Sequence, residues 1–68
     1  MKNLIKVERA RKDMTQAELA DKVQVSRQTI IAIESGRFIP STVLAFNIAG
    51  VLGCKVDEIF ELEEGDWE

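Results

Sequence analysis

The strongest constraint on the fold of this chain is a pair of potential helix starts, Thr15 and Ser26, that leave room for only one short helix between them. Thr15 and Glu18 have the spacing of a capping box, in which the hydroxyl accepts from the third helical amide and the carboxylate accepts from the cap amide. Ser26 offers a second hydroxyl that can cap a helix. The sequence therefore predicts two short helices, over residues 16–23 and 27–35, with a tight turn between them.

The apolar residues of both predicted helices follow helical spacing. They recur every three or four positions and form one buried stripe, made of Leu19, Ala20, Val23, Ile30 and Ile33. Val25 interrupts this rhythm between the two helices, and Gly36 is suited to the left-handed conformation that ends a helix. This is the arrangement of a helix-turn-helix.

Three further helices are expected on either side of this pair. The first covers residues 2–12, where apolar and charged side chains mix. Pro40 disfavours helix at the residue before it, and Ser41 can cap a nearly all-apolar helix that runs to Leu52. A last short helix covers residues 56–60. No segment alternates as strands do, so we expect an all-α domain of five helices. Its further core residues are Leu44, Ile48 and Leu52.

Length and residue usage limit the possible functions. With 68 residues the chain makes one domain, over residues 1–62, followed by an acidic tail over residues 63–68. A core this small is marginal by itself, which favours a partner chain. The single cysteine, Cys54, has no second cysteine and no histidine to join it, so we interpret it as a small buried apolar residue. No metal site, cofactor site or glycine-rich phosphate loop is expected, and the sequence argues against an enzyme.

The charges divide the chain into two unlike parts. Residues 1–40 carry eight basic and five acidic side chains, whereas residues 41–68 carry one basic and seven acidic ones. Partner choice follows the local field, so the amino-terminal part can face a polyanion although the net charge is −3. The acidic end either aids solubility or serves a specific partner. Without a signal peptide or a long apolar run, the chain is expected to be soluble and cytoplasmic.

Four motifs, in order, resemble a known family. These are Thr15-Gln16-Ala17-Glu18-Leu19-Ala20, Val25-Ser26-Arg27-Gln28-Thr29-Ile30, Ile33-Glu34-Ser35-Gly36 and the segment of residues 52–60. Together they resemble the helix-turn-helix DNA-binding domain of the Xre and Cro phage-repressor type, and most closely its short stand-alone regulators. The resemblance implies a compact five-helix fold whose third helix enters the major groove of DNA.

The resemblance also implies which residues meet DNA. The base-reading positions are Arg27, Gln28 and Ala32, with Ser26 and Ile31 beside the groove. Arginine can bind guanine, glutamine can bind adenine, and alanine can touch the thymine methyl group. The family uses a glutamine at the start of the second helix on a phosphate, often bracing the third helix, and Gln16 stands there. The other candidate phosphate contacts are Thr29, Arg37 and the backbone of Phe38.

Two other features follow from the same resemblance. The family commonly pairs an arginine of the first helix with a glutamate near the end of the third, which here are Arg9 and Glu34. The turn position that is usually glycine is Gln24, so a residue with a side chain is expected to take a positive φ.

The leading hypothesis is a homodimer that binds a two-fold operator as a regulator, with repression expected. An apolar surplus on the fourth helix and beyond marks candidate interface residues. They are Val43, Phe46, Asn47, Gly50, Val51, Ile59, Leu62 and Trp67. Alternatively, Phe46 and Val51 fill the core of a monomer. A different class of function is an antitoxin-like module whose acidic end binds a partner protein and which also regulates its own gene.

Overall fold

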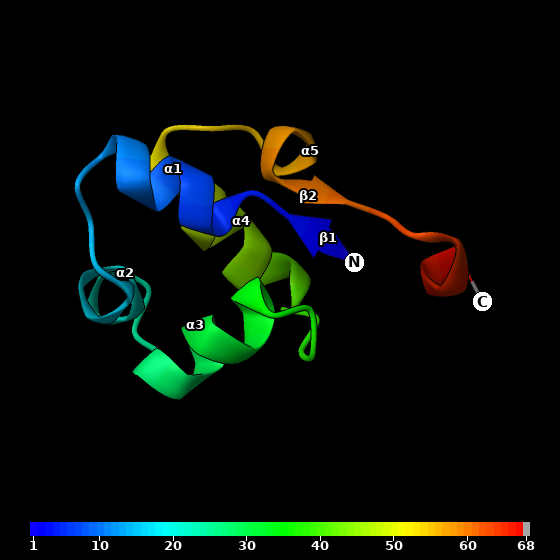
Figure 1. Ribbon diagram of the computed structural model, residues 1–68, viewed down its shortest axis with the longest axis horizontal. Coiled ribbons are helices and arrows are strands. Elements are labelled where there is room, and N and C mark those ends of the chain that lie inside the picture. Colours follow the sequence, from blue (N-terminus) through cyan, green and yellow to red (C-terminus); the bar gives the residue numbers. More distant parts are fainter. Residues whose placement is uncertain (68) are drawn as a thin grey trace.

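Five α-helices and one small β-ribbon make up the fold (Figure 1). The computed structural model describes residues 1–67, with the side chain of Trp67 outside that description. The helices are α1 (Ile5–Arg11), α2 (Gln16–Lys22), α3 (Arg27–Glu34), α4 (Thr42–Leu52) and α5 (Val56–Ile59). The strands β1 (Lys2–Asn3) and β2 (Phe60–Glu61) form the ribbon, and a 3-10 helix, η1, spans Glu64–Trp67. The expected all-α fold with five helices is confirmed in its helices, and the ribbon is an addition to it.

Hydroxyl side chains start three of the helices. At α2, Thr15 Oγ1 accepts from the Glu18 amide at 3.0 Å, and Glu18 Oε1 accepts from the Thr15 amide at 3.0 Å. The hydrogen bonds from Thr15 lower the pKa of Glu18, because they stabilise its charged form. Ser26 Oγ accepts from the Thr29 amide at 3.2 Å at the start of α3, and Ser41 caps α4 in the same way. The predicted caps are confirmed.

The turn between α2 and α3 depends on one residue with a left-handed backbone conformation. Gln24 takes a φ of 60°, as expected for the position that is usually glycine. This left-handed conformation costs a residue with a side chain about 1 kcal/mol. The Val25 amide then donates to the Ala20 carbonyl oxygen at 3.0 Å, which fixes the direction in which α3 begins.

One hydrophobic core holds the helices together. Its buried members come from every helix and from β2: Ile5, Leu19, Ala20, Val23, Ile30, Ile33, Ala45, Ile48, Ala49, Leu52, Ile59 and Phe60. All the predicted core residues are among them except Leu44, which is only half-buried. The core face of α4 runs through Ala45, Ile48 and Leu52, and Leu44 lies at its edge.

The β-ribbon corrects two expectations. The first helix was expected from Lys2, but it begins at Ile5, because residues 2–3 pair with residues 60–61 in antiparallel register. The Leu4 amide adds a bond to the Ile59 carbonyl oxygen at 2.9 Å. The expectation that the chain has no strands was therefore wrong. Two-residue strands are too short to show alternation in the sequence.

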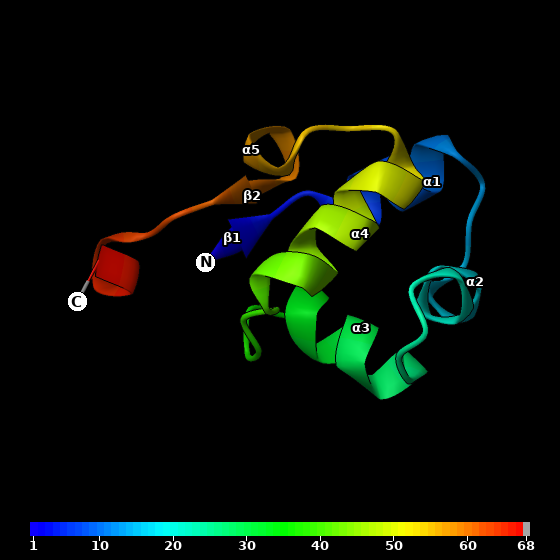
Figure 2. The same cartoon turned by 180° about the vertical axis from the view of Figure 1, so that it is seen from behind.

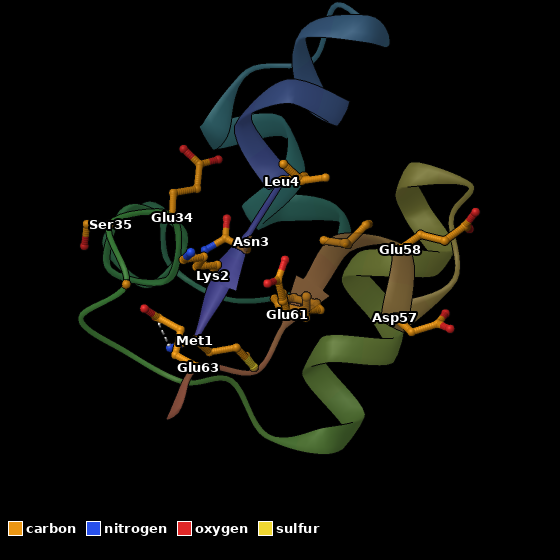
Figure 3. Close-up of a pocket in the computed structure, with 13 residues that line it drawn as sticks. Met1, Lys2, Asn3, Leu4, Glu34, Ser35, Asp57, Glu58, Glu61 and Glu63 are labelled. Atoms are coloured by element: carbon orange, nitrogen blue, oxygen red, sulfur yellow. Dashed lines mark ion pairs between the residues drawn. The ribbon is translucent and has the colours of Figure 1, made fainter. Parts of the chain in front are cut away.

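The amino terminus is tied to the acidic end of the chain (Figure 3). The Met1 ammonium lies 3.0 Å from Glu63 Oε1 and 3.1 Å from Asp66 Oδ2, and the figure marks the ion pair with Glu63. Hydrogen bonds to these carboxylates raise the pKa of the ammonium. Along the described residues, no helix is both long enough and apolar enough to span a lipid bilayer.

Candidate nucleic-acid interface

The amino-terminal turn of α3 projects at one edge of the molecule, beside α2 (Figures 1 and 2). Both views place the acidic carboxyl-terminal segment at the opposite end of the long axis from α2. The carboxylates of that segment are therefore kept away from the start of α3. A polyanion can approach α2 and α3 without meeting them.

The predicted base-reading residues lie on two successive turns of α3. Arg27 and Gln28 are exposed at its first turn, and Ile31 and Ala32 are half-buried one turn further on. Ser26 holds the helix start, and its Oγ lies 3.0 Å from Thr29 Oγ1. The Arg27 and Gln28 side chains therefore face solvent and are available to a ligand.

The residues predicted to contact phosphates differ in their exposure and in the hydrogen bonds that they already make. Arg37 is exposed, and its Nε donates to Ser35 Oγ at 3.1 Å. The Thr29 hydroxyl is engaged only with Ser26. The Phe38 amide donates to the Ala32 carbonyl oxygen at 3.2 Å, so a phosphate would have to compete with this bond. A phosphate contact of the Phe38 backbone stays a prediction.

A largely buried ion pair lies behind these residues. Arg9 Nε donates to Glu34 Oε2 at 2.6 Å, and Arg9 Nη2 donates to Glu34 Oε1 at 3.1 Å. Arg9 Nη1 also donates to the Met14 carbonyl oxygen at 2.9 Å. The side chains are only 12% and 8% exposed, so they are held in one geometry that ties α1 to the end of α3.

Gln16 extends this pair toward the exposed turn of α3. Its Nε2 donates to Glu34 Oε1 at 3.0 Å, and its Oε1 accepts from Arg27 Nη2 at 3.5 Å. Sequence reasoning treated Gln16 and the Arg9–Glu34 pair separately. Only the fold brings the start of α2 next to the end of α3.

A second missed contact also positions α3. Asn3 Nδ2 donates to the Ile33 carbonyl oxygen at 2.8 Å, which links β1 to the last turn of α3. The Ile33 carbonyl oxygen also accepts from the Gly36 amide at 3.0 Å, so Asn3 adds a second hydrogen bond at the end of α3. No sequence pattern indicated this role, since it depends on the ribbon.

The predicted dimer residues fall into separate groups. Val43, Phe46 and Leu62 are 70%, 62% and 50% exposed, so Phe46 does not fill the monomer core. Asn47 and Gly50 are also exposed, and Val51 is half-buried against the core. Ile59 is only 2% exposed, because it faces inward from α5, and it is therefore excluded from any interface. The side chain of Trp67 lies outside the described residues.

A hollow of about 510 Å³ lies between the β-ribbon, the end of α3 and α5. Figure 3 shows the side chains that line it. Its lining includes the acidic residues Glu34, Asp57, Glu58, Glu61 and Glu63. The Glu34 carboxylate points away from Met1 and Glu63 in this view. Met1 and Lys2 also line the hollow, and the acidic residues outnumber these basic groups, so the lining disfavours phosphate groups.

Neither the cysteine nor the carboxylates point to metal or redox chemistry in the described part of the chain. Cys54 is half-buried, and its Sγ lies 3.5 Å from the Leu52 carbonyl oxygen and 3.6 Å from Glu8 Oε1, which compete for its single proton. Burial, followed by the nearby Glu8 charge, raises the pKa of the thiol, which disfavours the reactive thiolate. No group of three potential metal ligands was found among these residues.

Comparison with known proteins identifies the family. A family model described as helix-turn-helix matches residues 5–59. An uncharacterized HTH-type transcriptional regulator of Methanocaldococcus jannaschii is 52% identical, over 97% of this chain and 100% of the relative. The ImmF control region 10 kDa protein of Bacillus phage phi105 is 36% identical, over 96% of this chain and 78% of the relative.

A solved structure agrees with these relatives. The clp gene regulator ClgR from Corynebacterium glutamicum has a TM-score of 0.75 and 31% sequence identity, and the match covers 79% of this chain and 57% of ClgR. These descriptions do not favour the antitoxin alternative. The helical fold, the exposed α3 and the matched residues 5–59 lead to one conclusion: the chain belongs to the helix-turn-helix family of Xre and Cro type, whose members are DNA-binding transcriptional regulators.

Proposed function

We propose that the protein is a homodimeric repressor that inserts α3 of each subunit into the major groove of a two-fold operator. The observation that carries this proposal is the exposed pair Arg27 and Gln28 at the start of α3, on a helix braced from behind by α2. Occupying an operator is enough to block transcription where the operator overlaps a promoter. Such a regulator acts where the chromosome lies, in the cytoplasm of a bacterium or archaeon.

The chemistry of α3 supports a division of labour along the groove. Arg27 donates to guanine O6 and N7, Gln28 pairs with adenine N6 and N7, and Ala32 touches a thymine methyl group. Ser26 and Ile31 flank these contacts. Gln16, Thr29 and Arg37 contact phosphates on either side and fix the position of the helix without reading sequence.

The surface of α4 supports a second copy of this chain as the partner. Val43, Phe46, Asn47 and Gly50 are exposed at three- and four-residue spacing, so they share one face of the helix. None of the eleven residues of α4 is charged. An uncharged apolar face can pack against its own copy about a two-fold axis, because such an interface brings the same patch together. Leu62 is also exposed, and Val51 is half-buried, so both stay candidates for the same interface.

The first test is the salt dependence of DNA binding. After selection of a binding site from random duplexes, we expect the affinity for that site to fall at least about tenfold between 50 and 200 mM salt. This estimate counts only Arg37 of each subunit, with about 0.9 in the log–log slope for each phosphate neutralised. Arg37→Gln should flatten that slope by about 2 for the dimer. A wild-type affinity that does not change with salt would count against phosphate contacts.

The second test addresses the dimer. Phe46→Glu places a charge in the centre of the α4 patch, and we expect sedimentation velocity to show a shift from dimer to monomer. Phe46 is 62% exposed, so its replacement should leave the circular dichroism spectrum unchanged. The matched control is Val7→Glu, since Val7 is an apolar residue of α1 that is 47% exposed. If both variants sediment as the wild type does, the interface lies elsewhere.

A further inference from the structure

A continuous line of polar contacts runs from α1 to the first turn of α3. It begins at Arg9, passes through the Glu34 carboxylate and the Gln16 amide, and ends at the Arg27 guanidinium. Every link joins residues far apart in the sequence, so the line exists only in the folded chain. Its last member is the exposed arginine to which base reading is assigned above.

The chemistry of the four groups gives this line a direction. A guanidinium only donates, and an ionised carboxylate only accepts, whereas an amide does both at different atoms. The Gln16 atom that faces Glu34 must therefore be Nε2, which leaves Oε1 on the side of Arg27. Rotating the amide by half a turn would set oxygen against carboxylate and nitrogen against guanidinium. The Glu34 charge thus selects the orientation of Gln16.

The Arg9 side makes Glu34 a rigid reference point. Two N–H donors of Arg9 bind the two Glu34 oxygens. A third N–H of Arg9 donates to the Met14 carbonyl oxygen, which fixes the position of the guanidinium. With only 8% of its side chain exposed, Glu34 has little freedom to follow a moving neighbour. The amide of Gln16 therefore takes its position from the core rather than from solvent.

We propose that Glu34 is a specificity-determining positioning residue, whose carboxylate, held by Arg9, orients Gln16 so that its oxygen aims Arg27 at the base that Arg27 reads. This inference rests on the proposed function of Arg27. Only Nη2 of Arg27 is engaged by Gln16, and a guanidinium has five N–H donors. Enough donors remain for guanine O6 and N7.

The final contact is weak in the free protein and strengthens in the complex. At 3.5 Å and exposed to water, the Arg27–Gln16 hydrogen bond is at the long limit for such a bond. DNA in contact with α3 expels water from this position, and a charge-assisted bond is stronger at lower dielectric. The aim of Arg27 is then fixed at the moment when bases are compared.

The experiment measures base discrimination, as the ratio of affinities for the selected site and for a site altered at one base pair. The pair assigned to Arg27 is the one whose ratio collapses in Arg27→Ala. Glu34→Gln should lower the ratio at that pair about three- to tenfold, the value of one hydrogen bond. In the Arg27→Ala background, Glu34→Gln should have no effect on it. The ratio at the pair read by Gln28 should stay unchanged in both backgrounds.

A second variant keeps the test independent of stability. Gln16→Met removes both amide bonds and leaves the Arg9–Glu34 pair in place, and it should lower the same ratio by the same factor. Its lost phosphate contact weakens all sequences equally, so it cancels in the ratio. Ile33→Val, a buried change on the same helix, destabilises the fold without touching the line and should leave every ratio unchanged.

The outcomes separate the inference from the function on which it rests. Wild-type protein that discriminates no base pair would remove the proposed function itself. Wild-type protein that discriminates, together with unchanged ratios in Glu34→Gln and Gln16→Met, would overturn the positioning role alone. A loss in Glu34→Gln that persists in the Arg27→Ala background would also overturn it, because the effect would then bypass Arg27.

Discussion

Replacing Arg9 with alanine is expected to lower the free energy of unfolding by about 3 to 5 kcal/mol, the cost of leaving a buried charge without its partner. Glu34, at 8% side-chain exposure, would lose both of its guanidinium bonds. The Met14 carbonyl oxygen would lose its bond from Arg9 as well. Urea denaturation followed by circular dichroism measures the change.

Arg11 supplies the matched control, because it is the other arginine of α1. Its side chain is 73% exposed, and its Nη1 lies 3.8 Å from Glu8 Oε2, so the guanidinium is largely solvated although Glu8 is only 17% exposed. Arg11→Ala should cost less than about 1 kcal/mol, as exposed pairs do. Equal losses in the two variants would contradict the importance of burial at Arg9.

A double variant separates the attraction between Arg9 and Glu34 from the free-energy cost of burying their charges. Replacing a buried ion pair by apolar residues of similar volume is often neutral, whereas removing one partner is strongly destabilising. Arg9→Met combined with Glu34→Leu should therefore recover a large part of the stability that Arg9→Ala loses. No recovery would mean that the bonds to Met14 and Gln16 matter more than the charge pair.

The helix starts and the turn could be predicted from the sequence because their causes are local. A capping box needs only Thr15 and Glu18 at the right spacing, and the structure has both of its hydrogen bonds. The positive φ of Gln24 followed instead from the family resemblance, which places Gln24 at a turn position that is usually glycine. Interactions within four residues leave a trace in the sequence that does not require knowledge of the fold.

The ribbon could not be predicted, because it joins the two ends of the domain. Lys2 pairs with Glu61, and neither strand is long enough to carry a pattern of its own. The same ribbon fixes the direction in which α5 enters, so Ile59 turns into the core at 2% exposure. Its assignment to a dimer surface failed for that reason.

The same distinction between local and long-range causes applies to the candidate site. The exposure of Arg27 and Gln28 followed from the apolar stripe on the other side of α3, which Ile30 and Ile33 fill. The hydrogen bond of the Phe38 amide could not be predicted in this way, because it depends on how the chain after α3 folds back onto the Ala32 carbonyl oxygen. Local periodicity tells which face of a helix is free, but it does not tell which loop amides are.

Removing either exposed side chain at the start of α3 should relax base preference without unfolding the protein. Arg27→Ala and Gln28→Ala are each expected to reduce discrimination at one or two base pairs by about 1 to 3 kcal/mol, the value of a bidentate contact with a base. Both residues are exposed, so the thermal unfolding midpoint should stay close to that of the wild type. Competition binding against single-base variants of the selected site gives the measurement.

The comparison with Arg37→Gln distinguishes base reading from simple attraction to DNA. Arg37 is exposed beyond the end of α3, where it is proposed to bind a phosphate, so its loss should weaken all sequences by a similar factor. Arg27→Ala and Gln28→Ala should instead bring the selected site and its single-base variants closer together in affinity. If these two variants weakened every duplex equally, the start of α3 would contribute charge and shape but no sequence readout, and specificity would have to come from DNA deformation instead.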